Sequence, residues 1–247
     1  MKTVIITGGN KGIGLDIVKC FLKANYNVIV GARSDNGFQK NLEGDVLFHS
    51  INVKNFSGHL ELVELAMQKF GRLDCYVNNA GFSAWRPIEE IDEDFLEDIL
   101  STNLKGTFWG CKAAALKMLD GATIINISSI AGKRGSSNNS AYCSSKFGVN
   151  GLTQSLSKEL GPRGIRVNAL CPVLIKTDGL IDALKENFSP AKLDPEKFIT
   201  DFARDNSALK RLPKGEEVGN MAVFLASNEA SAITGQCINV DCGVLPQ

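Results

Sequence analysis

A tyrosine and a lysine lie four residues apart in the stretch "SAYCSSKFG", as Tyr142 and Lys146. If this stretch is helical, the two side chains share one face of the helix. A phenol is a poor acid or base at neutral pH, because its usual pKa is about 10. The charge of a lysine one turn away would lower that pKa, and a pKa nearer the working pH improves proton transfer. The pair is therefore a candidate proton-handling centre, although a lone pair of this kind is more often a packing arrangement.

A glycine-rich loop, "TGGNKGIG" (Thr7–Gly14), follows an apolar run and opens a helical pattern. Glycines in such a loop permit a tight turn, a close approach of the backbone to a pyrophosphate, and close packing of helix on strand. The helix that follows presents unpaired N–H groups and a partial positive charge to the phosphates. In this strand–loop–helix context the pattern predicts dinucleotide binding.

Short β-rich runs alternate with longer helical patterns, which is typical of a parallel sheet covered by helices on both faces. The predicted strands are Thr3–Thr7, Asn27–Gly31, Val46–Ile51, Leu73–Asn78, Ala122–Ile127, Arg166–Leu170 and Cys237–Asp241. The predicted helices are Ile13–Ala24, Gly58–Phe70, Glu93–Met118, Ala141–Leu160 and Glu216–Ser227. No repeat or linker divides the chain, so we expect one catalytic domain over residues 1–247.

One segment, at about residues 178–213, departs from this alternation. It contains two short amphipathic patterns, prolines and many charges around "SPAKLDPEK". An insertion between a strand and the last helix is where a mobile lid over a site is expected. A surface excursion without function is the alternative.

The composition excludes several classes of protein. The chain has 27 basic and 27 acidic residues, so no nucleic-acid or anionic-membrane surface is indicated. No apolar run is long enough to span a membrane, and the N-terminus does not resemble a signal peptide. Seven cysteines without a CxxC pair predict reduced thiols in a cytoplasmic protein, and two histidines leave little material for a metal site.

Three motifs together resemble the short-chain dehydrogenase/reductase family. They are the spacing G-x-x-x-G-x-G in the glycine loop, "NNAG" at Asn78–Gly81, and Y-x-x-x-K at Tyr142–Lys146, in the order and approximate separations of that family. The resemblance spans essentially the whole chain and is nearest to the 3-oxoacyl-[acyl-carrier-protein] reductase and sugar dehydrogenase branch. It implies an α/β Rossmann fold, a doubly wound parallel sheet in the order 3-2-1-4-5-6-7, and an NAD(P)-dependent oxidoreductase.

The resemblance also implies a role for each of four residues. Tyr142 would give a proton to the reduced substrate, and Lys146 would favour the phenolate and bind the nicotinamide ribose. Ser129, thirteen residues before the tyrosine, would hydrogen-bond the substrate oxygen as charge develops on it. Asn103 matches the residue that holds a water in the proton relay.

The residue that ends the second strand indicates which dinucleotide is preferred. An NAD enzyme of this fold has an acidic residue there for the ribose 2′-hydroxyl. This chain has Ala32 and Arg33, and an arginine suits a 2′-phosphate. Lys11 would add a second positive charge, whereas Asp35 argues the other way. The sequence thus predicts NADP(H) in preference to NAD(H).

The full set of cofactor-binding residues that the resemblance implies is Gly8, Asn10, Lys11, Gly12, Ile13, Gly14, Arg33, Ser34, Asn52, Val53, Asn79, Ala80, Gly81, Tyr142, Lys146, Pro172, Ile175 and Thr177.

Three positions depart from the family pattern. Asn52 replaces an aspartate near adenine, Val173 replaces a glycine after the sixth strand, and Cys242 replaces the middle glycine of a late "DGG". We expect Val173 to narrow the site or to alter the pose of the substrate.

The substrate is less well defined. Ser83, Trp85, Lys133 and Arg134 are candidate pocket residues, and Trp85 is as well suited to a core or an interface. The stretch "KMLDGATI" lacks the basic residues expected of a protein that docks an acidic carrier. This favours a polyol, a sugar derivative or another small ketone, with 3-oxoacyl-[acyl-carrier-protein] reductase as the alternative.

Two other classes remain open at this point. A non-catalytic NADP(H)-binding regulator would be favoured by a broken catalytic set, and a sugar-nucleotide epimerase by a longer chain with a further domain. The resemblance also implies a homotetramer, or a homodimer, assembled through the long helices that carry Asn103 and Tyr142.

Overall fold

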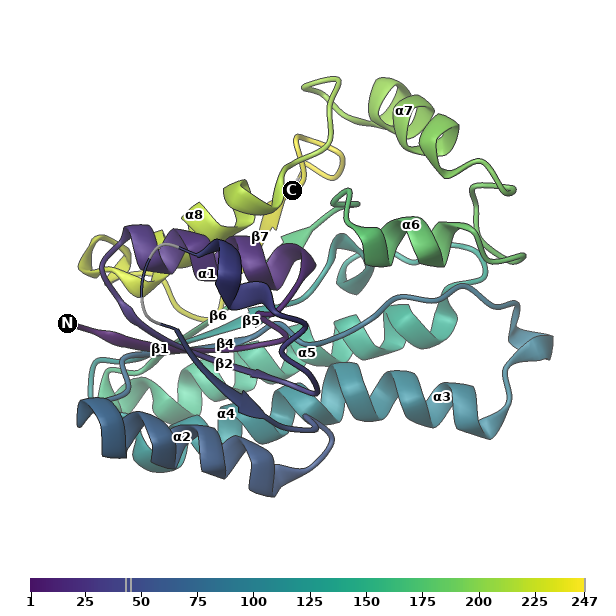
Figure 1. Ribbon diagram of the computed structural model, residues 1–247. Coiled ribbons are helices and arrows are strands. Elements are labelled where there is room, and N and C mark those ends of the chain that lie inside the picture. The colour runs from purple at the N-terminus through teal and green to yellow at the C-terminus, as the bar shows by residue number, and fades with distance from the viewer. Residues whose placement is uncertain (43, 45, 247) are drawn as a thin grey trace.

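Seven parallel strands form one sheet in the computed structural model, which describes residues 1–42, 44 and 46–246. The strand order is β3-β2-β1-β4-β5-β6-β7, which confirms the predicted topology (Figure 1). The strands are β1 (Thr3–Thr7), β2 (Asn27–Ala32), β3 (Val46–Ser50), β4 (Cys75–Asn78), β5 (Thr123–Ile127), β6 (Arg166–Pro172) and β7 (Cys237–Val240). The chain order reverses between β1 and β4, and the carboxyl ends of these two strands are adjacent.

Helices cover both faces of the sheet. They are α1 (Gly12–Lys23), α2 (Phe56–Phe70), α3 (Glu93–Leu100), α4 (Gly106–Lys117), α5 (Ser140–Leu160), α6 (Asp178–Leu184), α7 (Pro195–Asn206) and α8 (Gly215–Ala226). Side chains of α1 and α8 share one apolar cluster with the sheet, and side chains of α2, α4 and α5 share another on the opposite face (Figure 1). No helix among the described residues is long and apolar enough to cross a membrane.

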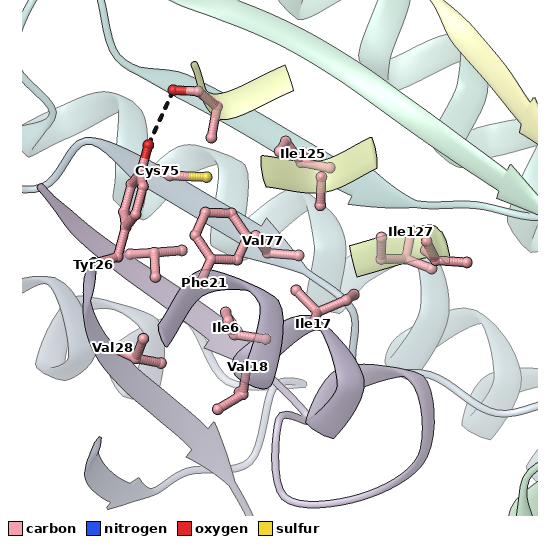
Figure 2. Close-up of a cluster of buried hydrophobic side chains, with 14 of the residues drawn as sticks. Ile6, Ile17, Val18, Phe21, Tyr26, Val28, Cys75, Val77, Ile125 and Ile127 are labelled. Atoms are coloured by element: carbon pink, nitrogen blue, oxygen red, sulfur yellow. Dashed lines mark hydrogen bonds between the residues drawn. The ribbon is translucent and has the colours of Figure 1, made fainter. Parts of the chain in front are cut away.

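The face under α1 and α8 has a dense apolar core (Figure 2). Phe21 and Tyr26 meet edge to face with ring centroids 5.0 Å apart, and the Tyr26 hydroxyl donates to the carbonyl of Ala226 at 3.3 Å. Burying a large apolar side chain is worth about 1.5–3 kcal/mol. Because both faces of the sheet are covered, its central strands are apolar on both sides, as their near-continuous Val and Ile sequences require.

Buried amides join the sheet to the helices on the other face. Asn78 of β4 donates to Asn126 of β5 at 2.9 Å, and Asn126 donates to the hydroxyl of Thr153 on α5 at 2.9 Å. Gly110 of α4 packs directly on Asn78, since a Cβ atom at that position would lie 1.9 Å from Asn78 Oδ1. These contacts fix the position of α5 against the sheet.

The helix predicted over Glu93–Met118 is interrupted. Residues Ser101–Lys105 form a π-helical turn between α3 and α4. The side chain of Asn103, inside this turn, bonds to the backbone of Phe82 instead of pointing into solvent. The Thr107 hydroxyl donates to the carbonyl oxygen of Asn103 at 2.7 Å. Single π-helical turns of this kind are frequent at functional sites.

The insertion carries α6 and α7, as the two amphipathic patterns predicted, and it lies beyond the carboxyl ends of the strands (Figure 1). Trp85, in the loop after β4, is buried in the apolar cluster of this insertion with Leu184 and Ile199. It therefore anchors the insertion to the loop after β4. The side chain belongs to a core, and its burial leaves no free face on which a sugar could stack.

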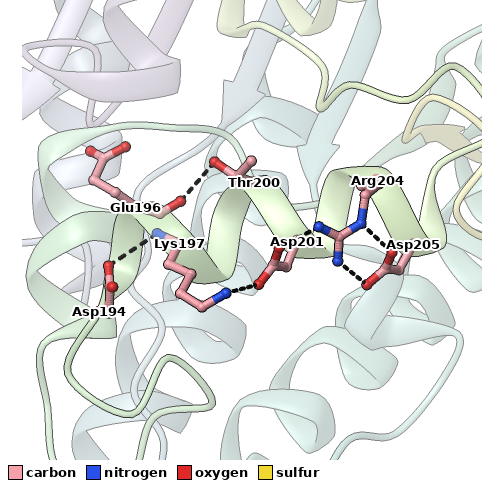
Figure 3. A network of polar contacts seen from close by, with 7 residues as sticks. All are labelled: Asp194, Glu196, Lys197, Thr200, Asp201, Arg204 and Asp205. Atoms are coloured by element: carbon pink, nitrogen blue, oxygen red, sulfur yellow. Dashed lines mark hydrogen bonds and ion pairs between the residues drawn. The ribbon is translucent and has the colours of Figure 1, made fainter.

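The solvent face of α7 carries a network of charged groups (Figure 3). Asp201 accepts from Lys197 and from Arg204 at 2.7 Å each, and Asp194 caps the helix by accepting from the backbone N–H of Lys197 at 3.0 Å. Exposed pairs such as these are worth at most about 1 kcal/mol each. The apolar face of α7 is therefore what holds it on the molecule.

Candidate active site

The loops after β1 and β4 are tied together by two residues. The hydroxyl of Thr7 accepts from the backbone N–H groups of Asn79 and Ala80 at 3.0 and 3.1 Å. In return, the Asn79 amide donates to the carbonyl oxygens of Thr7 and Gly8 at 2.9 and 3.2 Å. The side chain of Asn79 is thus occupied in shaping the glycine loop, while its neighbour Ala80 lies against Gly8.

The glycine loop has the geometry of an anion-binding turn. Gly8 and Gly12 adopt φ values of +66° and +53°, which favour glycine. A Cβ atom on Gly14 would lie 2.2 Å from the carbonyl oxygen of Gly8, so no larger residue fits there. The N-terminal cap of α1, Lys11, makes no side-chain cap to the helix among the described residues. The first N–H groups of α1 are consequently available to phosphates.

The end of β2 lies beside this loop. Asn10 donates to the carbonyl oxygen of Ser34 at 2.8 Å, which joins the two segments. Arg33 is exposed, and within residues 1–42, 44 and 46–246 its guanidinium has no hydrogen-bond or ion-pair partner. Asp35 accepts from the backbone N–H of Gly37 and so shapes the following turn. Arg33 therefore offers its guanidinium to a ligand at this position.

A buried histidine, to which sequence reasoning gave no function, supports the loop after β3. His59 Nε2 lies 2.9 Å from the carbonyl oxygen of Val53, and Nδ1 lies 2.7 Å from the Tyr76 hydroxyl. Desolvation lowers the pKa of His59, so the imidazole is neutral at pH 7. Because a carbonyl can only accept, Nε2 carries the proton and Nδ1 accepts from Tyr76. Asn52 caps the same turn by accepting from the backbone N–H of Lys54 at 3.1 Å.

Ser129, Tyr142 and Lys146 come together where β5 meets α5. The hydroxyl of Ser129 lies near the Tyr142 phenol and lowers its pKa. Lys146 Nζ donates to the carbonyl oxygen of Ile127, the last residue of β5, at 2.8 Å, and lies 5.7 Å from the centroid of the Tyr142 ring. Ser129 follows β5 by two residues and caps the short turn after it by accepting from Ala131 N–H at 3.1 Å.

Burial sets the protonation states of this group. Desolvation raises the pKa of Tyr142 to about 12, and the neighbouring Ser129 hydroxyl partly offsets this rise. Desolvation lowers the pKa of Lys146 to about 8. At neutral pH the phenol is protonated and the lysine still carries most of its charge. The arrangement thus holds a neutral proton donor next to a buried cation.

Asn103 joins the loop after β4 to α5. Its Oδ1 accepts from Phe82 N–H at 3.0 Å, and its Nδ2 donates to Phe82 O at 2.8 Å and to Ser145 Oγ at 3.3 Å. A Cβ atom on Gly81 would lie 2.9 Å from Asn103 Oδ1 and 3.7 Å from Lys146 Nζ. The side chain of Asn103 is therefore used for positioning, and its backbone carbonyl is the group that could hold a water.

The segment after β6 closes the other side of this group. Ser129 Oγ donates to the carbonyl oxygen of Pro172 at 3.5 Å. Thr177 caps α6 by accepting from Leu180 N–H at 3.2 Å, and its methyl group would lie 3.5 Å from a Cβ atom on Gly12. The start of the insertion therefore lies against the glycine loop. Ile175 is buried in the cluster under α1 and α8.

The two apolar departures from the family pattern have structural explanations. Val173 is buried against Ile130 and Val244, so its bulk joins the turn after Ser129 to the C-terminal segment. Cys242 is partly exposed and adopts φ +55°, a region that favours glycine, so a cysteine is strained there.

The remaining pocket candidates lie at the edge of the site. The backbone N–H groups of Lys133 and Arg134 both donate to the carbonyl oxygen of Ile130, at 2.9 and 3.0 Å. Neither side chain has an ion-pair partner within the part of the chain that the structure describes. Ser83 follows Phe82 in the loop after β4 and is partly buried. Among the described residues, no group of three His, Cys, Asp or Glu side chains could hold a metal ion.

Comparisons with known proteins show the family and the fold to which the chain is similar. Residues 8–245 match the family model described as enoyl-(acyl carrier protein) reductase. The chain is 33% identical to 3-oxoacyl-[acyl-carrier-protein] reductase FabG of Chlamydia pneumoniae, covering 98% of this chain and 96% of that protein. It is 36% identical to a diacetyl reductase [(S)-acetoin forming] of Staphylococcus epidermidis, with coverage of 99% and 98%. The ligand-free structure of Thermoplasma acidophilum aldohexose dehydrogenase superimposes with a TM-score of 0.89 at 31% identity, covering 100% and 97% of the two chains.

Replacing Asn103 by aspartate tests its positioning role. Asn103→Asp puts a carboxylate oxygen opposite the carbonyl of Phe82 in a fully buried position. We expect an unfolding free energy lower by about 3 kcal/mol or more at pH 7. Burial raises the pKa of the new carboxyl above its unfolded value of about 3.9, so the native state holds the proton longer and the loss grows as pH rises from about 4.

Chemical denaturation at several pH values measures this loss. The matched control is Asn206→Asp, because the Asn206 amide also donates to a carbonyl, that of Phe202, at 3.1 Å, but is exposed. The control should change stability by less than about 0.5 kcal/mol. Equal losses in the two variants would contradict the positioning role.

Proposed function

Because the chain belongs to the short-chain dehydrogenase/reductase family of NAD(P)-dependent oxidoreductases, we propose that it transfers a hydride between NADP(H) and a small carbonyl or alcohol substrate. The substrate class is a polyol, a sugar derivative or a ketone, and Tyr142 is the general acid and base. The observation that carries this proposal is the meeting of Ser129, Tyr142 and Lys146 at the carboxyl end of β5, where Gly81 of the loop after β4 approaches Lys146.

Each of these residues has a defined task in carbonyl reduction. The nicotinamide, when bound, supplies the hydride. Ser129 donates to the carbonyl oxygen and stabilises the negative charge that develops there. Tyr142 then gives its proton to that oxygen. The charge of Lys146 favours the phenolate that remains, and this is why a lysine buried beside the phenol is useful although desolvation lowers its pKa.

The preference for NADP(H) rests on the end of β2. Arg33 is exposed beside the glycine loop and free of an ion-pair partner among the described residues, while Asp35 is engaged with the backbone of Gly37. A guanidinium gives a 2′-phosphate two parallel charge-assisted hydrogen bonds. Lys11, at the start of α1, lies on the same loop and adds positive charge.

A free substrate is favoured over one attached to an acidic carrier protein. The exposed segment from Glu89 to Asp98 carries seven carboxylates, and Ile99, next to it, packs against Ala141, the neighbour of Tyr142. A dense negative field beside the site opposes an acidic partner. The alternative, 3-oxoacyl-[acyl-carrier-protein] reductase, is favoured by the relatives of that name and by the positive charges of Lys133 and Arg134 at the edge of the site.

A non-catalytic NADP(H)-binding regulator is the candidate from another class. It would need no proton donor, whereas here the Tyr142 phenol lies beside the buried ammonium group of Lys146. We further propose that residues 1–247 act as one catalytic domain in the cytoplasm, with residues 178–213 as a lid. The apolar contacts of Trp85 with this segment would hold the lid over the site.

The same fold has two apolar surfaces suited to self-association. Phe108 and Leu116 on α4 and Phe147 on α5 are exposed, as is Phe224 on α8. Exposed large apolar side chains grouped on helices are typical of protein interfaces. We propose a symmetric homotetramer that uses both surfaces, with a homodimer through α4 and α5 as the smaller alternative.

Removing the phenol hydroxyl tests the reaction. NADPH oxidation by the purified protein against sugar-like ketones, aromatic ketones and acyl thioesters should identify a substrate. Tyr142→Phe should then lower kcat by about a thousandfold with little change in NADPH affinity, because only proton transfer is lost. Tyr26→Phe is the matched control, since the Tyr26 hydroxyl bonds to Ala226 in the core under α8. NADPH binding without turnover of any substrate would favour the regulator.

Neutralising Arg33 tests the cofactor preference. Arg33→Ser should raise the KM for NADPH about tenfold or more, because hydrogen bonds to a charged group are worth about 1.5–3 kcal/mol. The KM for NADH serves as the internal control and should stay the same. An equal rise for both cofactors would contradict a contact with the 2′-phosphate.

Introducing a charge on α5 tests the assembly. Phe147→Glu should reduce the molecular mass in solution, measured by light scattering, because a buried unpaired carboxylate is costly in an interface. Ile88→Glu, an exposed apolar position away from α4, α5 and α8, is the control and should leave the mass unchanged. A wild-type protein that is monomeric at micromolar concentration would overturn the proposal.

A further inference from the structure

Two cysteines lie on neighbouring strands at the edge of the sheet. In the parallel pairing of β6 with β7, Cys237 is opposite Ala169 and Cys171 is opposite Asn239. Successive side chains alternate between the two faces of a strand, so these four residues point to the same face. Cys171 and Cys237 are thus diagonal neighbours on that face, which is covered by α5.

The two neighbouring thiols differ in exposure. Cys171 is fully buried, whereas Cys237 is partly exposed. Cys171 Sγ also lies 3.9 Å from Asn150 Oδ1 on α5. In such a pair, an oxidant reaches the exposed thiol first. The buried thiol can then form a disulfide with the oxidised sulfur.

Charges nearby act differently on the two sulfurs. The neighbouring thiol of Cys171 and the ammonium group of Lys133 lower the pKa of Cys237. The proximity of Cys237, together with burial, raises the pKa of Cys171. Since thiolates are the reactive form, Cys237 is the sulfur that an oxidant meets first.

We propose that Cys171 and Cys237 are a peroxide-sensitive dithiol that closes to a disulfide and thereby switches off the adjacent catalytic group. The thiolate of Cys237 attacks hydrogen peroxide, takes one oxygen atom to become a sulfenic acid, and releases hydroxide. The thiol of Cys171 then attacks that sulfur, which forms the S–S bond, and the proton and the sulfenic oxygen leave as water. The protein loses two electrons and the peroxide gains them. A thiol reductant reverses the change.

The catalytic group is coupled to this pair through β6. A disulfide needs Cα atoms within about 7 Å. Parallel strands lie about 4.8 Å apart and rise about 3.3 Å per residue, so residues offset by two positions on adjacent strands are about 8 Å apart. Closing the bond therefore draws the end of β6 toward β7, which is the edge strand of the sheet. The residue after Cys171 is Pro172, whose carbonyl oxygen accepts from Ser129 Oγ.

A second contact leads from Cys171 to the same serine. Asn150, beside Cys171, donates to the carbonyl oxygen of Gly132 at 2.9 Å, and Gly132 N–H donates to Ser129 O at 2.9 Å. A shift of Cys171 thus moves the hydroxyl that holds the substrate oxygen.

Peptide mapping after treatment with hydrogen peroxide tests the bond. Trypsin leaves Cys171 as the one cysteine of residues 167–176, and Cys237 together with Cys242 on residues 215–247. We expect a cross-linked pair of these peptides, with a mass two hydrogen atoms below their sum, that disappears on reduction. The Cys242→Gly variant assigns the bond, because glycine suits the φ of +55° at that position and removes the competing thiol. It should give the same cross-link.

Variants of the pair connect the bond to activity. Peroxide should inactivate the wild type by at least about tenfold, and thiol reductant should restore the activity. Cys237→Ser should give no cross-link and keep its activity under the same treatment, and Cys171→Ala should leave a sulfenic acid on Cys237 that a dimedone probe labels. A cross-link through Cys242, or no cross-link where Cys237 is oxidised, would overturn the proposal. A complete Cys171–Cys237 bond with unchanged turnover would overturn the coupling.

The peptide map is independent of the proposed reaction. If the protein reduces no carbonyl compound, the cross-link still decides whether the dithiol exists, so failure of the proposed function and failure of this inference give different results.

Discussion

The structure depends on the adjacency of β1 and β4, where the order of strands along the sheet reverses. Two loops leave the carboxyl ends of these strands side by side, and Thr7 and Asn79 fasten them with four hydrogen bonds that involve both side chains. This clamp shapes the glycine loop, and the loop in turn places the start of α1 where phosphates can bind. The next residues after Asn79 lead directly to Gly81, which lies against Asn103 and Lys146. One junction therefore supports both the dinucleotide loop and the proton-handling group.

Buried polar side chains connect β4, next to this junction, with β5 and α5 in the interior of the protein. The amides of Asn78 and Asn126 and the hydroxyl of Thr153 form a continuous path from β4 through β5 to α5. In a low-dielectric interior such groups are costly unless paired, so the hydrogen bonds between these side chains favour one placement of the helix. Lys146, seven residues before Thr153 on the same helix, is thereby held with its ammonium group at the end of β5. Its lowered pKa is a consequence of that enforced burial.

Much of this could be predicted from the sequence, because the signals are local. The near-continuous Val and Ile strands, the glycine loop and the pattern of Tyr142 and Lys146 each occupy a few consecutive residues. Alternation of strand and helix requires parallel strands, and the family resemblance supplied their order. The interruption of the predicted helix at Asn103 was missed, because it depends on a bond to Phe82, twenty-one residues away. The helical periodicity of apolar residues carries no information about a contact between residues so far apart in the sequence.

The sequence by itself determined the class of fold, the dinucleotide loop and the residue types that could move a proton. Only the tertiary structure decided that Trp85 is a core residue, that Asn79 shapes a loop, and that His59 is neutral and supports Val53. It also placed Cys171 and Cys237, sixty-six positions apart, on one face of the sheet. The physical reason is that burial, hydrogen-bond partners and pKa depend on which segments are neighbours in space, and strand pairing creates those neighbours between residues that are distant along the chain.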